Sequence, residues 1–493
     1  MPLITALPVF FILSLSLFMY WPCLGHQFMI DDFFYLYESQ NPRTFLGLGD
    51  FFSKTVNQHY EPLNNLFNVT LFRVFPSAAQ LYFFNIVFLA IAAIALFYFI
   101  VCISENRTLA FTASTLFILH PTTADLVNHI SLNVVFVTGF FLLVSFVFLN
   151  QSSEKEARGN PGLLLSYLFY ILALLMQENV AIAFPFYVFT FLRIFKQCPL
   201  KDSLKKSFGF FILAFLHLTL WAFNHIGYDM ARIFAKQTSI LAIVVSFAKL
   251  LWWYLSNLFV PRDIIFMFNV PLEQDGGRAA AILALTVLAS TALVIFYKKA
   301  CKSPLTRFAF LWFFLGLIFI APASLTRPRL GLTLQPYWLF FPSMGFFILA
   351  AGGLLELKRR VSPFLYACLF FILCFSLAIS SLQINLYAST ELSYAHYWLK
   401  NNPRHHIPKM ILGTIYTYSE LRIPDELKPH MEELLGWYVA ARANQRALDL
   451  ADKLILSSEG QEQKSRYLSL KEALLLKIKK DTEEGQFKSF QKP

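Results

Sequence analysis

The sequence predicts an all-α polytopic membrane protein of about eleven transmembrane helices, followed by a small soluble helical domain. Of the 493 residues, 57% are hydrophobic and only 14% are charged, and the apolar residues form long uninterrupted runs. Soluble domains carry roughly 25% charged residues, and a helix needs about 20 apolar residues to cross about 30 Å of hydrocarbon. Such runs recur from the N-terminus to about residue 385.

The predicted crossings follow one another with short connections. They lie near residues 5–24, 81–103, 108–121, 131–149, 162–176, 180–195, 207–225, 279–297, 308–322, 337–355 and 361–385. Residues 239–260 are also apolar, but a crossing there would move two later basic loops to the opposite side. We therefore interpret 239–260 as a re-entrant or interfacial element.

Positive charges predict the orientation. Lys and Arg gather in four connections, at Lys155 and Arg158, at Lys196, Lys201, Lys205 and Lys206, at Lys298, Lys299, Lys302 and Arg307, and at Lys358, Arg359 and Arg360. If these connections are cytoplasmic, the first segment is an uncleaved signal anchor that starts in the cytoplasm, and the loop 25–80 is extracytoplasmic. We expect a bacterial inner membrane with an extracytoplasmic active site, or alternatively the endoplasmic reticulum membrane.

Composition also excludes some functions. The dispersed basic residues argue against nucleic-acid binding, and the six cysteines show no C-x-x-C spacing that would indicate a zinc site or a disulfide framework. The charge becomes evenly mixed after residue 386, so we expect a transmembrane domain over 1–386 and a soluble domain over 387–493. Within the latter, an amphipathic stripe over 433–456 and a second one from Tyr467 predict a helical hairpin like a degenerate tetratricopeptide pair.

Polar residues interrupt the apolar segments at four places. Asp31 and Asp32 directly follow the first span, and Glu178 separates two spans with only Gln177 and Asn179 beside it. Charged groups at such positions are costly and indicate a functional cavity. The alternative is a solvated turn that ends a helix for Asp31 and Asp32, and a cap of a helix hairpin at the membrane interface for Glu178. The other two places are His59-Tyr60-Glu61 in the first loop, and His120 to Asn133, where Asp125, Asn128 and His129 would share one side of a continuing helix.

Taken in order, these clusters resemble the GT-C superfamily of membrane glycosyltransferases, in particular the mannosyltransferase-like members that carry tetratricopeptide repeats. The resemblance covers residues 1–385. It rests on Asp31-Asp32, Tyr60-x-Pro62-Leu63, His120-Pro121 with Val127-x-x-Ile130-Ser131, Gln177-Glu178, and Tyr337-x-x-Phe340-x-Pro342-Ser343-x-Gly345. It implies transfer of a sugar from a polyprenyl-phosphate lipid to a protein, glycan or lipid acceptor.

The resemblance also implies roles for individual residues. Asp31 or Asp32 would be the catalytic base, and the substrate-binding residues would be His59, Tyr60, Glu61, His120, His129, Glu178, Arg327 and Arg329. No cofactor is required, although a divalent cation is left open. Glu61, Asn133 and Gln177 stand where the family usually has cations, so Arg327 and Arg329 are the expected phosphate clamp. The alternatives are an inactive GT-C-like scaffold and, with less support, a lipid or ion transporter.

Overall fold

The computed structural model is almost entirely helical and divides into two compact units, Met1–Thr390 and Glu391–Pro493. It describes residues 2–54, 59–152, 161–224, 240–261, 264–270, 273, 275–324, 332–441 and 443–490. Composition alone places the change of domain between residues 386 and 387.

The first unit is a multi-pass membrane protein, as the sequence predicts. Among the described residues, eight helices are long and apolar enough to cross a membrane: Ala6–Gly25, Ala78–Ser104 (α5), Ile130–Ser152, Glu178–Phe195, Leu200–Asn224 (α12), Gly276–Ala300 (α15), Pro336–Arg360 and Pro363–Tyr387 (α18). Three predicted crossings coincide with shorter apolar helices, α6 (Arg107–Leu119), α9 (Pro161–Met176) and α16 (Pro304–Ala323). The total of eleven crossings therefore stays a prediction.

Several of these spans combine two or more helical segments. The segments are α1 (Pro2–Tyr20) with η1 (Trp21–Gly25), η2 (Ile130–Leu132) with α8 (Asn133–Ser152), α10 (Glu178–Ala181) with α11 (Phe184–Thr190) and η3 (Phe191–Phe195), and η5 (Pro336–Leu339) with α17 (Phe340–Arg360). Pro22 and Pro185 each lie in the first turn of the segment that follows a joint.

Burial separates inner helices from outer ones. In the most apolar part of each span, 67% of the residues of Ile130–Ser152 are buried, compared with 6% in α15 and 11% in α18. The outer helices present large apolar side chains such as Phe215 and Phe371 outward, as lipid contact requires. Inside, α16 and α17 pack so closely that a Cβ on Gly345 would lie 2.6 Å from the carbonyl oxygen of Ala309.

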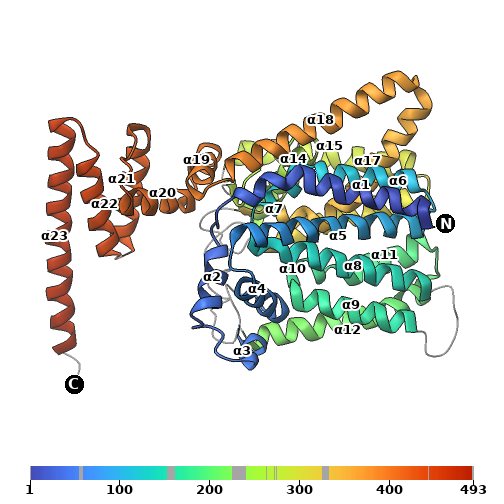
Figure 1. Cartoon of the computed structure of the whole chain (residues 1–493), viewed down its shortest axis with the longest axis horizontal. Helices are drawn as coiled ribbons and strands as arrows, with labels where there is room; N and C mark the ends of the chain where they lie inside the picture. The colour runs from blue at the N-terminus through green and yellow to red at the C-terminus, as the bar shows by residue number, and fades with distance from the viewer. Residues whose placement is uncertain are drawn as a thin grey trace. The chain divides into compact units, whose positions relative to one another are not determined.

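Short helices gather at one end of the bundle. These are α2 (Asp32–Gln40), α3 (Leu48–Ser53), α4 (Pro62–Val74) and α7 (Pro121–Val127). In Figure 1, α2, α3 and α4 lie at the end of the bundle opposite the N-terminus. We call this the acidic end, because Asp31, Asp32, Glu61 and Glu178 all lie in segments that meet there. The basic end is the other one, where α12 begins and where α15 and α17 finish, with Lys201, Lys298, Lys299, Arg359 and Arg360.

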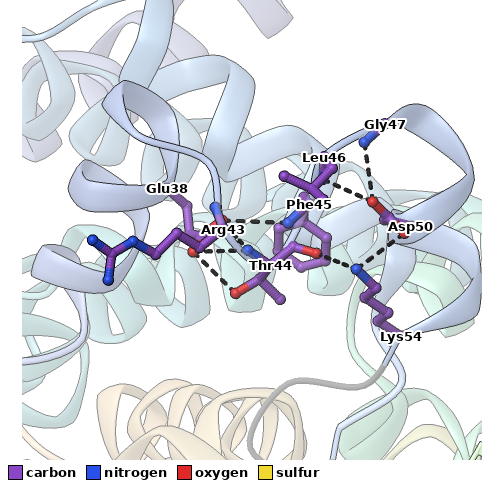
Figure 2. A network of polar contacts seen from close by, with 8 residues as sticks. All are labelled: Glu38, Arg43, Thr44, Phe45, Leu46, Gly47, Asp50 and Lys54. Atoms are coloured by element: carbon purple, nitrogen blue, oxygen red, sulfur yellow. Dashed lines mark hydrogen bonds and ion pairs between the residues drawn. The ribbon is translucent and has the colours of Figure 1, made fainter.

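One buried carboxylate organises the connection between α2 and α3. Glu38 accepts hydrogen bonds from the backbone N–H groups of Arg43, Thr44 and Phe45 and from the Thr44 hydroxyl (Figure 2). Burial raises the pKa of Glu38, but these donors outweigh burial and leave its pKa below the usual value. Asp50 accepts from the N–H groups of Leu46 and Gly47 at the start of α3, and Lys54 pairs with Asp50. The hydrogen bonds that Glu38 and Asp50 accept therefore stabilise the conformation of this part of the first loop.

The apolar stretch that we interpreted as interfacial forms the continuous helix α14 (Ile240–Phe259), which is not one of the eight spans. Lys249 pairs with Glu273, and the Tyr254 hydroxyl donates to the Gln335 carbonyl. The strands that follow, β1 (Phe268–Val270) and β2 (Leu332–Leu334), pair antiparallel. The interfacial interpretation of residues 239–260 therefore stays a prediction.

The second unit consists of consecutive helices packed on one core. They are α19 (Glu391–Asn401), α20 (His406–Tyr418), η6 (Asp425–Leu427), α21 (Lys428–Ala440), α22 (Asn444–Leu456) and α23 (Gln461–Phe490). The predicted stripe over 433–456 is not one helix, because the chain turns between α21 and α22. Both segments place apolar residues such as Leu434 and Leu450 in the same core, so helical periodicity alone did not reveal the turn.

Candidate functional site

The two adjacent aspartates at the start of α2 have different environments. Asp32 is fully buried, and its carboxylate accepts from the backbone N–H of Ser131 at 2.7 Å and from that of Met29 at 3.1 Å. Burial raises the pKa of Asp32 to about 7, although these two donors oppose the shift. Asp31 is exposed. Asp32 therefore fastens the start of α2 to the segment before α8, and Asp31 is the accessible carboxylate.

Glu178 connects the first loop to two transmembrane spans. It is 6% exposed at the start of α10. Its Oε1 lies 3.1 Å from Nδ1 of His59, and its Oε2 accepts from the backbone N–H of Tyr60 at 3.2 Å and lies 3.5 Å from Nε2 of His217 on α12. The rings of Tyr60 and His217 are also in contact, with centroids 5.6 Å apart and planes tilted by 47°. The Glu178 side chain is therefore buried, and both of its oxygens have partners from other segments.

A chain of side-chain amides leads to Glu61. Asn133 donates to Oδ1 of Asn68 at 2.8 Å, Asn68 donates to Oδ1 of Asn64 at 2.6 Å, and Asn64 donates to Oε2 of Glu61 at 2.8 Å. Residues 64 and 68 are one turn apart on α4, so a single helix face carries the two middle members. Asn133, which the sequence left unexplained, is the origin of this chain.

Tyrosines border the same cluster. The Tyr35 hydroxyl donates to Oδ1 of Asn65 at 3.4 Å, and burial together with the charges of Glu61 and Asp31 raises the pKa of Tyr35. The Tyr337 phenol, from η5, is within reach of the same two charges. Segments as distant in sequence as 31–35, 59–68, 178 and 337 thus come together at the acidic end.

His59 is the positively charged member of the cluster. Partial burial lowers its pKa, but the hydrogen bond to Glu178 and the charges of Glu61, Glu178 and Asp31 outweigh burial and raise the pKa to about 9. Its side chain is 40% exposed. An imidazolium ion therefore stands at the surface of the site at neutral pH.

His120 and His129 are placed differently from the cluster. His120 caps α7: its Nδ1 accepts from the Thr122 backbone N–H, and its Nε2 lies 3.1 Å from the Leu258 carbonyl. His129 is 1% exposed, with Nε2 3.8 Å from Asp125 and its ring against Phe266. Burial lowers the pKa of both, to about 4 and about 3, so both rings are neutral.

The sequence predicts that Asp125, Asn128 and His129 share one side of a continuing helix, but the helix ends before Asn128. α7 stops at Val127, Asn128 is its C-cap, and His129 has extended backbone. Asn128 instead donates to Oδ1 of Asn385 on α18 at 2.8 Å, and Asn385 donates to the Met19 carbonyl. These hydrogen bonds join α7 to the ends of α1 and α18, so Asn128 and Asn385 stabilise the packing of these helices.

Arg327 and Arg329 lie outside the described residues. Within the described ranges, no group of three or more His, Cys, Asp and Glu side chains could hold a metal ion. The residues that sequence reasoning missed are His217, Asn64 and Asn68. A histidine in the middle of an apolar span is itself a signal, because buried ionisable groups in membrane helices need a reason.

The cluster can perform acid–base chemistry on a polar substrate that reaches the boundary of the bundle. It offers an exposed carboxylate (Asp31), a half-buried carboxyl (Glu61), an imidazolium (His59) and phenols on its border. Comparison with protein-family models, with curated proteins and with solved structures finds no match to this chain.

Proposed function

We propose that this protein is a membrane glycosyltransferase that moves a sugar from a polyprenyl-phosphate lipid to a hydroxyl of a protein, glycan or lipid. One observation carries the proposal: the exposed carboxylate of Asp31 lies among His59, Glu61 and Tyr337 where apolar spans end. A donor with a hydrophobic tail and a polar head needs a site at that boundary, since the tail stays in the bilayer.

Asp31 is the general base of the proposed reaction. The acceptor oxygen attacks the anomeric carbon, the bond from that carbon to the phosphate oxygen breaks, and the electron pair leaves with the phosphate. The acceptor proton passes to the Asp31 carboxylate. Asp32 is a positioning residue, because both of its oxygens accept backbone N–H groups and hold α2 in place.

The proposal extends to the side of the membrane. Cations remain at the basic end, and such residues are retained in the cytoplasm, so the acidic end would face the periplasm or the lumen of the endoplasmic reticulum. Asp31 and His59 would then meet a donor that has already been flipped across the bilayer. This placement suits a secretory acceptor.

The test uses membranes that contain the full-length protein and a set of radiolabelled polyprenyl-phosphate sugars. We expect Asp31→Asn to lower transfer by about 10²- to 10⁴-fold, because the general base is lost. Asp202→Asn, an exposed acid at the basic end, is the matched control and should transfer normally. The proposal fails if the wild type transfers none of the sugars, or if Asp31→Asn transfers as well as the control.

A further inference from the structure

Two side chains of the cluster can donate hydrogen bonds to an anion. His59 uses Nδ1 for Glu178, which leaves Nε2 as its other donor, and the ring is accessible. Glu61 follows two residues later at the N-cap of α4, and its Oε2 accepts a hydrogen bond from the side-chain amide of Asn64. Two atoms remain for a ligand, Nε2 of His59 and Oε1 of Glu61. Within the part of the chain that the structure describes, the hydrogen bonds of these two side chains use the other atom of each.

The amide chain fixes where a proton on Glu61 would sit. Each asparagine from Asn133 to Asn64 donates toward Glu61, so Oε2 receives an N–H and acts as an acceptor. A proton on Oε2 would make that oxygen a hydroxyl, which is a weaker acceptor for the Asn64 N–H than a carbonyl oxygen is. The protonated carboxyl therefore carries its hydrogen on Oε1 and becomes a donor that points away from Asn64.

We propose, on the premise of the glycosyl transfer above, that His59 Nε2–H and the protonated Glu61 Oε1–H together bind the phosphodiester of the lipid-linked donor. The imidazolium supplies the charge, and the neutral carboxyl supplies a second hydrogen bond at the neighbouring position. The phosphate clamp is then made of a histidine and an acid, without any of the three cations that the sequence lacks at Glu61, Asn133 and Gln177.

The surroundings of Glu61 determine the pH at which it can donate. Burial raises the pKa of Glu61 to about 7; the charge of His59 and the Asn64 amide oppose this shift, and the charge of Glu178 adds to it. The other ionisable groups near it are Asp31 before α2, Tyr35 on α2, Tyr337 on η5 and, through Glu178, His217 on α12. Above about pH 7 the carboxylate would repel the phosphate.

The experiment measures binding to the purified full-length protein in nanodiscs. The probe is a polyprenyl methyl phosphate, a diester whose charge does not change between pH 6 and 8.5, and the uncharged polyprenol is the control. For the wild type we expect the affinity for the diester to fall about 30-fold between pH 6 and 8.5, since only the protonated acid binds. Polyprenol binding should not change with pH.

Glu61→Gln is the matched variant, because the amide keeps an acceptor for Asn64 and a permanent donor for the phosphate. We expect it to bind the diester with a nearly constant affinity across this pH range, and we expect His59→Gln to bind it more weakly at every pH. The inference is overturned if the wild-type affinity is independent of pH, which needs no variant to fold. It is also overturned if Glu61→Gln keeps the wild-type pH dependence or if His59→Gln binds normally.

A competing lipid and a comparison of binding with transfer distinguish the phosphate clamp from general lipid binding and from the proposed function. Phosphatidylglycerol, a diester of the bilayer itself, should not displace the probe; displacement at equal concentration would overturn the assignment to a polyprenyl donor. A wild type that transfers sugar but binds the diester independently of pH retains the proposed function and loses the clamp. A wild type with pH-dependent binding and no transfer retains the clamp and loses the function.

Discussion

The two ends of the bundle differ in how far their charged side chains are buried. At the basic end, Arg359 and Arg360 are 81% and 73% exposed, and they pair with Glu356 on their own helix. At the acidic end, Asp32 and Glu178 are buried and take their partners from distant segments. Exposed charges orient a membrane protein at little cost, whereas buried charges are stable only when other elements supply hydrogen bonds.

This difference explains why only one end is a candidate site. A charge that stays in water needs no fixed neighbours, so its position tolerates change. The carboxylates of the acidic end are held by backbone N–H groups, histidines and amides that come from the first loop, α4, α8 and α12. Polar groups held in this way are preorganised, which means that they are in position for the reaction before a substrate binds.

The largest expected effect on stability comes from Glu178. Glu178→Ala leaves the Tyr60 N–H and two histidines without their acceptor, so we expect the free energy of unfolding to fall by about 3–5 kcal/mol. Glu356→Ala at the basic end is the matched control and should leave unfolding unchanged. Equal effects of the two variants in a detergent unfolding assay would remove the contrast between the ends.

The next effect concerns Asp32. An amide cannot accept from both backbone donors, so Asp32→Asn leaves the N–H of Met29 or of Ser131 facing a donor. We expect a loss of about 2 kcal/mol in the same assay. Asp31→Asn should retain wild-type stability while losing transfer, and a stability loss in Asp31→Asn equal to that in Asp32→Asn would contradict the assigned difference between the two residues.

A smaller effect is expected where α16 and α17 touch. Gly345→Ala would place Cβ 2.6 Å from the Ala309 carbonyl, so the helices must separate, at a cost of about 1–2 kcal/mol. On the same helix but closer to the basic end, Gly352 has no atom within 4 Å of such a Cβ. Gly352→Ala should therefore be neutral or slightly stabilising, and a penalty as large as that of Gly345→Ala would show that packing does not differ along α17.

The smallest effect is a pH dependence. The pKa of His59 rises from 6.5 to about 9 on folding, so its stabilising contribution is complete below pH 6.5 and disappears as the pH rises through 9. Because the side chain is 40% exposed, we expect the contribution to stay below about 1 kcal/mol. The difference in thermal stability between wild type and His59→Gln should shrink from pH 6 to pH 9.5, and a difference that grows over this range would refute the assignment of charge.

The sequence by itself determined that the protein is helical and crosses a membrane several times. Span length and hydropathy are local properties, so every predicted crossing overlaps a helix. Asp31, Asp32, Glu61 and Glu178 were also recognisable as candidates, because a charge next to an apolar run stands out wherever it folds.

Only the tertiary structure decided what each of these residues does. Asp31 and Asp32 are chemically identical neighbours, and their difference arises because the N–H of Ser131, about a hundred residues later, meets one of them. His217 joins Glu178, and Asn133 joins the chain to Glu61, through packing between helices that no local pattern encodes. Hydropathy is summed along the chain, whereas a hydrogen bond depends on two atoms meeting in space.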